Sequence, residues 1–179
     1  MTEKRIKPYG EWKSPITTDL IVSKFRGFGE ILIDGGYIYW VENRPEEEGR
    51  NVIVKAAPDG HTEDIIPEGF NARTRVHEYG GGSFLVHEGV VYFSNFEDQR
   101  IYCIKEDNEP HPLTPEGSLR YADGIYDRTR NRIICVREDH RGRGEPENSI
   151  ISLDINNSGE GRALLSGNDF YSSPRVSPD

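Results

Sequence analysis

Short hydrophobic runs alternate with polar turns along most of the chain, and the same arrangement recurs about every fifty residues. Residues 32–40 consist of two short runs of alternating apolar residues around a glycine-containing turn, and residues 85–93 repeat this pattern 53 positions later. Residues 66–69 likewise return 48 positions later as residues 114–117. Periods of roughly 20–50 residues with about four strands in each are typical of β-propeller blades. The pattern therefore predicts an all-β protein built as a propeller.

We expect a partial propeller over residues 28–179, with about three four-stranded antiparallel blades and the start of a fourth. The predicted blades span about residues 28–70, 71–117 and 118–167, and the fourth begins at residue 168. Pairing is expected to be antiparallel because the connections are short and contain no helical pattern. Closed propellers have about four to eight blades, so we interpret the chain as an incomplete propeller and a fragment of a longer protein. A two-sheet sandwich also uses many short strands, but the recurrence favours the propeller.

The first part of the chain, residues 1–27, lacks this alternation and is expected to contain a short helix. Ser14 suits the position before a helix, because its hydroxyl can accept a hydrogen bond from a free amide, and the proline after it suits the first helical position. Ile16, Leu20 and Ile21 would then share one face. We expect this face to pack against the sheets.

Charge and composition narrow the possible partners and the cellular setting. With 31 acidic and 22 basic residues the net charge is −9, which argues against a nucleic-acid partner and against an anionic membrane surface. The first thirty residues hold no leader-like apolar stretch, and no apolar run is long enough to span a bilayer. Cys103 and Cys135 lie in apolar strand-like runs and are expected to be buried free thiols. These features predict a cytoplasmic protein.

Motifs for catalysis or metal binding are missing from the sequence. A Gly-x-Ser-x-Gly nucleophile turn does not occur, and the nearest candidate, Ser83 in residues 81–85, lacks the second glycine and leads into a strand. Zinc-helix, calcium-loop and phosphate-loop motifs are likewise missing. We therefore expect no catalytic residue, no metal and no cofactor in this chain.

Two polar strings are candidates for contacts with a substrate or with another domain. Residues 73–82 combine charged and aromatic side chains with three consecutive glycines, and residues 137–148 mix both charge signs with glycine and proline. The candidate contact residues are Arg75, His77, Glu78, Tyr79, Glu138 and His140. The alternative interpretation is structural: the first string would join two blades, with Glu78 paired to Arg73 or Arg75 and the glycines fitting a crowded inner strand. The second string would be a solvated loop.

Several of these strings resemble a known family. Residues 9–16, 75–82 and 137–145, in this order, are similar to the N-terminal propeller of prolyl oligopeptidase-family serine peptidases. The closest resemblance is to the acylaminoacyl-peptidase and dipeptidyl-aminopeptidase-like branch. Residues 173–179 resemble the start of a TolB-type propeller blade.

The resemblance implies a propeller that covers a C-terminal α/β-hydrolase domain, which carries the catalytic Ser, Asp and His and is reached only by short peptides. Our first hypothesis is therefore a non-catalytic propeller part of a serine peptidase that controls peptide access. Alternatives are a TolB-like interaction scaffold without hydrolase activity and, less favoured, a calcium-dependent propeller lactonase. We further hypothesise that Glu78 or Glu138 receives the α-ammonium group of a substrate.

Overall fold

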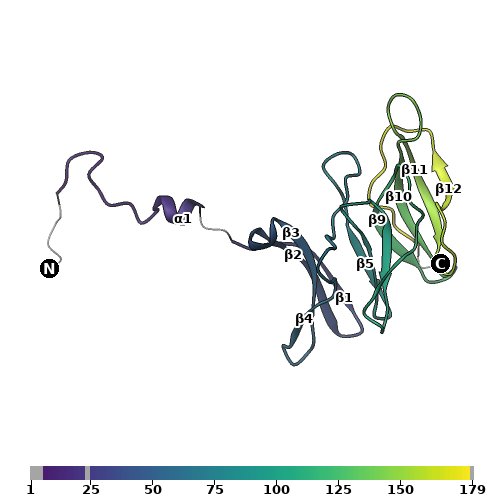
Figure 1. Cartoon of the computed structure of the whole chain (residues 1–179), viewed down its shortest axis with the longest axis horizontal. Helices are drawn as coiled ribbons and strands as arrows, with labels where there is room; N and C mark the ends of the chain where they lie inside the picture. Colours follow the sequence, from purple (N-terminus) through teal and green to yellow (C-terminus); the bar gives the residue numbers. More distant parts are fainter. Residues whose placement is uncertain (1–5, 23–24, 178–179) are drawn as a thin grey trace.

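The computed structural model describes residues 6–22 and 25–177, and in these ranges it contains one short α-helix and three four-stranded antiparallel sheets (Figure 1). The first sheet consists of β1 (Gly27–Asp34), β2 (Tyr37–Arg44), β3 (Arg50–Ala56) and β4 (Thr62–Asp64). The second consists of β5 (Phe84–His87), β6 (Val90–Ser94), β7 (Ile101–Ile104) and β8 (Pro110–Pro112). The third consists of β9 (Leu119–Asp127), β10 (Arg132–Asp139), β11 (Glu147–Asp154) and β12 (Arg162–Ser166).

The three sheets are arranged as consecutive propeller blades. Strands within each sheet follow chain order, and the first strands of successive blades lie together, since β1 contacts β5 and β5 contacts β9. Figure 1 shows the sheets side by side, stacked face to face. This radial stacking of four-stranded sheets confirms the predicted incomplete propeller.

Two-residue turns explain the recurring sequence pattern. The turn between β1 and β2 places Gly35 and Gly36 at φ values of 56° and 84°, and the turn between β5 and β6 places Glu88 and Gly89 at 50° and 78°. Two-residue hairpins that match the twist of the strands require positive φ at both positions. The Gly89 N–H also donates to Asp34 Oδ2 at 2.8 Å, so the turns of neighbouring blades are joined.

The middle sheet supplies apolar side chains to both of its neighbours. Successive residues of a strand point to opposite faces, and on β6 Phe93 packs in the core against the first sheet while Tyr92 packs in the core against the third. On β7, Tyr102 likewise packs in the core against the first sheet, and Cys103 packs in the core against the third. Burial raises the pKa of the Cys103 thiol and that of Cys135, the latter to about 12. Both cysteines are free and buried, as expected.

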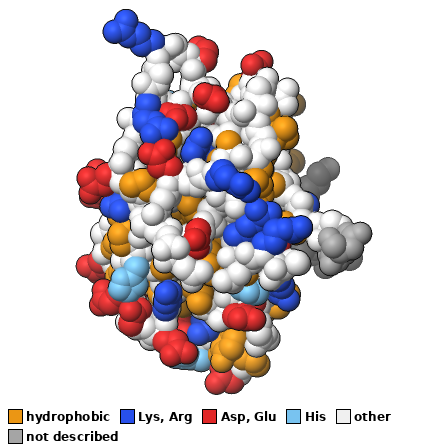
Figure 2. All heavy atoms as spheres, turned by 90° about the vertical axis from the view of Figure 1, so that its right-hand side faces the viewer, with side chains coloured by type: hydrophobic (Ala, Val, Ile, Leu, Met, Phe, Trp, Pro, Cys, Tyr) orange, Lys and Arg blue, Asp and Glu red, His pale blue; other side chains and the backbone are white. Residues whose placement is uncertain are grey.

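One face of the first sheet is left without a covering sheet, and we call it the free face. Ile31 lies opposite Trp40 and Ile33 opposite Ile38 in the β1–β2 register, so these four side chains share that face. Ile33 is 76% exposed and Ile31 is 69% exposed. The outer side of the third sheet differs, because Figure 2 shows acidic, basic and hydrophobic side chains intermixed over it.

The N-terminal helix differs from the expectation in its start and in its packing. The helix α1 spans Thr18–Val22, and Thr17 Oγ1, rather than Ser14, accepts an amide hydrogen bond at its start, from Leu20 N–H at 3.1 Å. Ser14 Oγ instead accepts from the N–H two residues on, that of Ile16. The predicted packing against the sheets was wrong: Ile16 is exposed, and α1 lies apart from the sheets (Figure 1). The side chain of Ile21 lies outside the described part.

Residues 167–177, where the fourth blade was expected to open, run beside the third sheet without forming a strand. The Ser173 N–H donates to Asp123 Oδ2 at 2.8 Å, so this segment follows the inner edge of the sheet. Within the described ranges, the structure contains no helix of sufficient length and apolarity to cross a membrane.

Candidate functional site

The candidate residues gather at one end of the sheets. The start of β1 lies at one end of the sheets. Because neighbouring strands are antiparallel, the connections β2–β3, β4–β5 and β10–β11 lie at this same end. The connections at this end include residues 140–146 and residues 65–83, the longest connection between two strands, whereas the opposite end has the two two-residue turns and, at most, the seven-residue connection 155–161. We call it the long-loop end. Both polar strings singled out in the sequence therefore lie at the same end of the molecule.

Glu138, near the end of β10, is the buried centre of this group. Its side chain is 3% exposed. Oε1 accepts a hydrogen bond from the His77 backbone N–H at 2.8 Å, and Oε2 lies 2.9 Å from His140 Nε2. A buried carboxylate is stable only when such partners replace its water shell. Glu138 thus anchors the tip of the loop 65–83 to the third sheet.

The loop tip itself has an unusual backbone. His77 and Glu78 have φ values of 55° and 65°, a left-handed conformation that side chains other than glycine adopt at some cost in free energy. Two bonds hold the tip: Glu78 Oε1 accepts from Arg120 Nη1 at 2.6 Å, and the same nitrogen donates to the Arg75 carbonyl at 2.8 Å. The bond from Arg120 lowers the pKa of Glu78. The alternative pairing of Glu78 with Arg73 or Arg75 was therefore wrong, since its partner lies on β9.

The aromatic members of the group complete the loop tip. His77 Nε2 lies 3.2 Å from Asn148 Oδ1, and its ring meets the ring of Phe170 edge-on at 5.0 Å. Tyr79 is exposed, with its ring 5.8 Å from that of His77. The side chain of Arg75 points elsewhere, with its guanidinium 4.3 Å from the centre of the Phe96 ring.

Of the six candidates, five are thus brought together: His77, Glu78, Tyr79, Glu138 and His140. Sequence reasoning missed Arg120 and Asn148, which both lie directly opposite Glu138 in the strand register. Asn148 lies within the polar string 137–148 but was not chosen as a candidate, and the signal for Arg120 was strand register, which the sequence pattern did not define to a single residue.

Close packing explains the glycines of the first polar string, as Gly82 shows. A Cβ at Gly82 would lie 2.9 Å from Glu30 Oε1 and 3.0 Å from Asp123 Oδ1, so any side chain there would force these carboxylates to shift. Both carboxylates approach because they bind backbone amides: Gly82 N–H donates to Asp123 at 2.6 Å, and Ser83 N–H donates to Glu30 at 2.9 Å. The structure therefore supports the alternative interpretation of these glycines as a fit to crowded inner strands.

Glu30 and Asp123 were also missed from the sequence, and both lie at register shifts. The β1–β2 pairing slips between Gly29 and Ile31, and the β9–β10 pairing slips between Ile134 and Val136. Such bulges change the direction in which a side chain points. Burial, with a smaller effect of the Asp123 charge, raises the pKa of Glu30.

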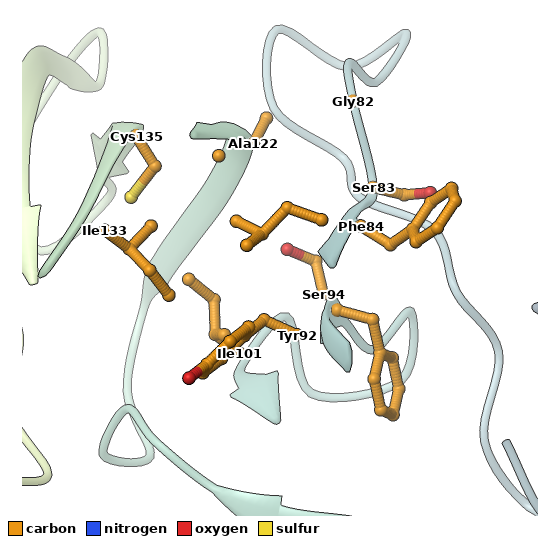
Figure 3. A pocket seen from close by; sticks show the side chains of 12 residues that line it. Gly82, Ser83, Phe84, Tyr92, Ser94, Ile101, Ala122, Ile133 and Cys135 are labelled. Atoms are coloured by element: carbon orange, nitrogen blue, oxygen red, sulfur yellow. The ribbon is translucent and has the colours of Figure 1, made fainter. Parts of the chain in front are cut away.

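A groove of about 670 Å³ runs along the first strands of the three blades. Glu30 and Asp123 line it, as do His87 and Tyr126, whose rings stack at 3.7 Å. A second cavity, between the second and third sheets, has a volume of only about 20 Å³ and is lined mainly by apolar side chains, with Ser83 and Ser94 (Figure 3). Since this is about the room one water needs, this cavity is too small for part of a peptide, whereas the groove along the first strands is large enough.

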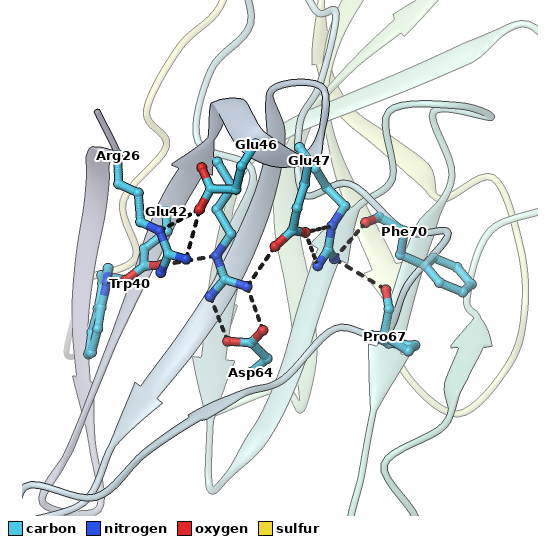
Figure 4. A network of polar contacts seen from close by, with 10 residues as sticks. Arg26, Trp40, Glu42, Glu46, Glu47, Asp64, Pro67 and Phe70 are labelled. Carbon is cyan, nitrogen blue, oxygen red and sulfur yellow. Dashed lines mark hydrogen bonds and ion pairs between the residues drawn. The ribbon is translucent and has the colours of Figure 1, made fainter. Parts of the chain in front are cut away.

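The free face of the first sheet carries an ionic network (Figure 4). Arg44, whose side chain is 9% exposed, donates to both oxygens of Asp64 at 2.6 and 2.7 Å and to Glu42 at 3.0 Å. Arg26 and Glu46 extend the network. The bond from Arg44 lowers the pKa of Asp64. The network joins β2 to β4 across β3, so its role is structural. In the described part of the chain, no group of three or more His, Cys, Asp or Glu residues is placed to hold a metal ion.

No protein-family model matches the chain, and no curated protein matches it significantly. Solved structures do match. A puromycin-hydrolysing peptidase from Mycobacterium tuberculosis is 33% identical, with a TM-score of 0.84, and the match covers 98% of this chain and 30% of that one. A puromycin hydrolase crystal structure is 30% identical, with a TM-score of 0.71 and coverages of 84% and 25%. A mutant of puromycin hydrolase complexed with PGG is 31% identical, with the same TM-score and coverages.

The stacked blades and these matches define the class: the chain has the fold of an incomplete propeller, and its structural neighbours are prolyl oligopeptidase-family peptidases, the family that the sequence motifs resemble. More particularly, it is homologous to the N-terminal domain of puromycin-hydrolysing peptidases. It spans less than a third of the length of the peptidases it matches.

Proposed function

We propose that this chain forms part of the propeller of a cytoplasmic serine peptidase and controls the access of short peptides to a C-terminal α/β-hydrolase domain. The observation that carries the proposal is the match over 98% of this chain to a peptidase more than three times as long. The acylaminoacyl-peptidase and dipeptidyl-aminopeptidase-like branch fits the motifs at residues 75–82 and 137–145. The two buried free thiols support a reducing compartment.

The control of access is steric. The groove along the first strands is about 670 Å³ in volume, room for a few residues of an extended peptide but not for a folded domain. The long-loop end supplies the side chains that an entering peptide meets. There, Glu78 is the carboxylate suited to an α-ammonium group, because its side chain is exposed and its bond to Arg120 uses Oε1. Glu138, by contrast, is buried and both of its oxygens are bonded.

The product of the complete reading frame tests the proposal. It should react with a fluorophosphonate probe for active-site serines, and kcat/KM should fall at least tenfold between peptides of about five and about forty residues that share one cleavage sequence. In the same assay, Glu78→Gln should raise KM more for peptides with a free N-terminus than for N-acetylated ones, and Glu68→Gln should change neither.

Each outcome is informative. A full-length product that lacks a reactive serine would contradict the peptidase proposal and favour the TolB-like scaffold. A reactive serine with equal rates for short and long peptides would contradict the control of access alone. Equal effects of Glu78→Gln on free and acetylated peptides would remove that residue from substrate recognition.

A further inference from the structure

Two arginines of the loop 65–83 share one aromatic ring at the long-loop end. The guanidinium of Arg73 lies 4.8 Å from the centre of the Phe96 ring, and the guanidinium of Arg75 lies 4.3 Å from it. A guanidinium above an aromatic ring is attracted by the electrons of the ring face. These distances of 4.8 and 4.3 Å keep the two positive charges within about 9 Å of each other, where they repel.

The second blade holds both arginines in place through their backbone. The Arg73 N–H donates to the Ser94 carbonyl at 3.0 Å, and the Arg75 N–H donates to Gln99 Oε1 at 2.7 Å. Thr74 between them is buried, whereas both arginines are exposed. Since alternate residues of an extended segment share one side, the two guanidiniums point to the solvent side of the loop.

Neither arginine of this pair forms an ion pair within the described part of the chain. The nearby carboxylate of Glu78 is bonded to Arg120 instead, and this bond is the main cause of its lowered pKa, with a smaller effect of the Arg75 charge. A guanidinium above a ring keeps N–H donors at its edge that fit the two oxygens of a carboxylate. The pair therefore has free donors and no counter-charge, although the chain as a whole has a net charge of −9.

A small polar pocket opens beside Arg73. Its volume is about 190 Å³, and its walls include Arg73, Thr74, Tyr79 and Asn51 of the first blade. This is room for the end of a peptide but not for a folded segment. Glu78, whose side chain is exposed, precedes Tyr79 in the same loop. One loop thus presents a carboxylate and two guanidiniums near a pocket, and these charges are opposite to those at the two ends of a short peptide.

We propose that Arg73 and Arg75 bind the C-terminal carboxylate of a short peptide. The inference rests on the proposed function, because it takes the peptide substrate as the ligand, and it adds the group that recognises the end opposite to the α-ammonium group. Two guanidiniums provide the planar, paired donors that suit a carboxylate. A longer peptide carries its C-terminal carboxylate beyond the reach of the pair, so the site favours short substrates by charge as well as by size.

Binding of two small peptides to the product of the complete reading frame tests the proposal. Tetra-alanine and its C-terminal amide compete with a fluorogenic peptidase substrate that lacks a carboxylate, and the inhibition constants of the two peptides are compared. The wild type should bind the free acid about tenfold more tightly than the amide, because only the acid accepts charge-assisted bonds from the pair. The double variant Arg73→Gln with Arg75→Gln should bind both peptides equally.

A matched control and a conservative variant separate recognition from general charge. Arg143→Gln removes a positive charge at an exposed position of the connection 140–146, at the same end of the sheets, and should keep the preference for the free acid. Arg73→Lys with Arg75→Lys keeps both charges without the paired donors and should retain part of the preference. Urea denaturation shows whether each variant is folded. If the double glutamine variant is not, Arg75→Gln alone should lower the preference.

Two results would overturn the inference: equal binding of the two peptides by the wild type, or an unchanged preference in the double glutamine variant. In either case, a fall in hydrolysis of the carboxylate-free substrate in that variant would assign the arginines to a carboxylate of the hydrolase domain. A protein with a reactive serine and a length limit on peptides, but no preference for the free acid, would lose the carboxylate site and keep the proposed function.

Discussion

Glu138 shows how one buried charge organises the candidate site. It lies on β10, yet it determines the conformation of a loop tip 61 residues earlier in the chain through the bond from His77 N–H. The second oxygen holds His140. Because the loop tip has two consecutive residues with positive φ, its conformation depends on such external bonds rather than on local preference.

Replacing this carboxylate should therefore destabilise the fold. In Glu138→Gln, one of the two acceptor oxygens becomes an NH₂ group and the negative charge is lost, so the bonds from His77 N–H and to His140 are no longer both made to a carboxylate. We expect a loss of about 1–3 kcal/mol in the free energy of unfolding, measured by urea denaturation. Glu145→Gln, in the exposed part of the neighbouring loop, should change it by less than about 0.5 kcal/mol. Equal effects of the two variants would contradict the anchoring role.

At the scale of the strand, the inner strands of the blades are joined by the same kind of contact, a carboxylate that accepts hydrogen bonds from backbone amides. Glu30 on β1 binds the Ser83 amide of the second blade, and Asp123 on β9 binds Gly82 and Ser173 on either side of it. Each carboxylate lies where a strand slips its register. A bulge interrupts the alternation of side chains along a strand. Here each bulge directs a carboxylate toward the backbone of an adjacent segment.

The first blade adds a pH-dependent element through Arg44 and Asp64. Because Arg44 holds the pKa of Asp64 below its ordinary value of 3.8, the pair stabilises the fold above that pH, and the stabilisation is lost as the pH falls through the folded-state pKa. Asp64→Asn should cost about 1 kcal/mol at pH 7, a modest value because Asp64 is partly exposed.

The difference between wild type and Asp64→Asn should shrink as the pH falls from 4 toward 3, as measured by urea denaturation at each pH. For Asp169→Asn, at an exposed position, the free energy of unfolding should equal that of the wild type at every pH measured. A gap that stays constant down to pH 3 would contradict the ion-pair explanation.

At the scale of the whole molecule, the blades shield one another's apolar side chains from solvent only on the faces where they are stacked. The middle sheet is covered on both faces, whereas the free face of the first sheet leaves Ile31 and Ile33 largely exposed. Exposed apolar side chains on a sheet face favour association with further surfaces. In the proposed parent protein, further blades would cover this face.

The 179-residue chain should consequently self-associate, and Ile33→Lys should weaken this association without loss of stability. Sedimentation velocity over a concentration series measures it. Thr62→Lys adds the same charge at an exposed position of the same sheet and leaves the apolar face intact, so it should reduce association less. If both variants act equally, charge repulsion rather than the apolar face controls association.

The blades could be predicted from the sequence because their signals are local. Two-residue alternation and turns such as Gly35–Gly36 act over a few residues, and their recurrence marks each blade. The candidate site was predicted only in part: five residues cluster, but Arg120 and Glu30 are recognised only through partners 42 and 53 positions away. The apolar residues around Ile16 led to the expectation that the N-terminal helix packs against the sheets, and this expectation was wrong because Ile16 is exposed.

The sequence by itself determined the strands, their hairpins and the four-stranded unit, since backbone preference and side-chain alternation depend on near neighbours. The tertiary structure alone decided which carboxylate meets which amide, why a glycine is favoured at position 82, and that α1 lies apart from the sheets. These features depend on contacts between distant segments, whose distances are set only when the blades stack and their side chains exclude water.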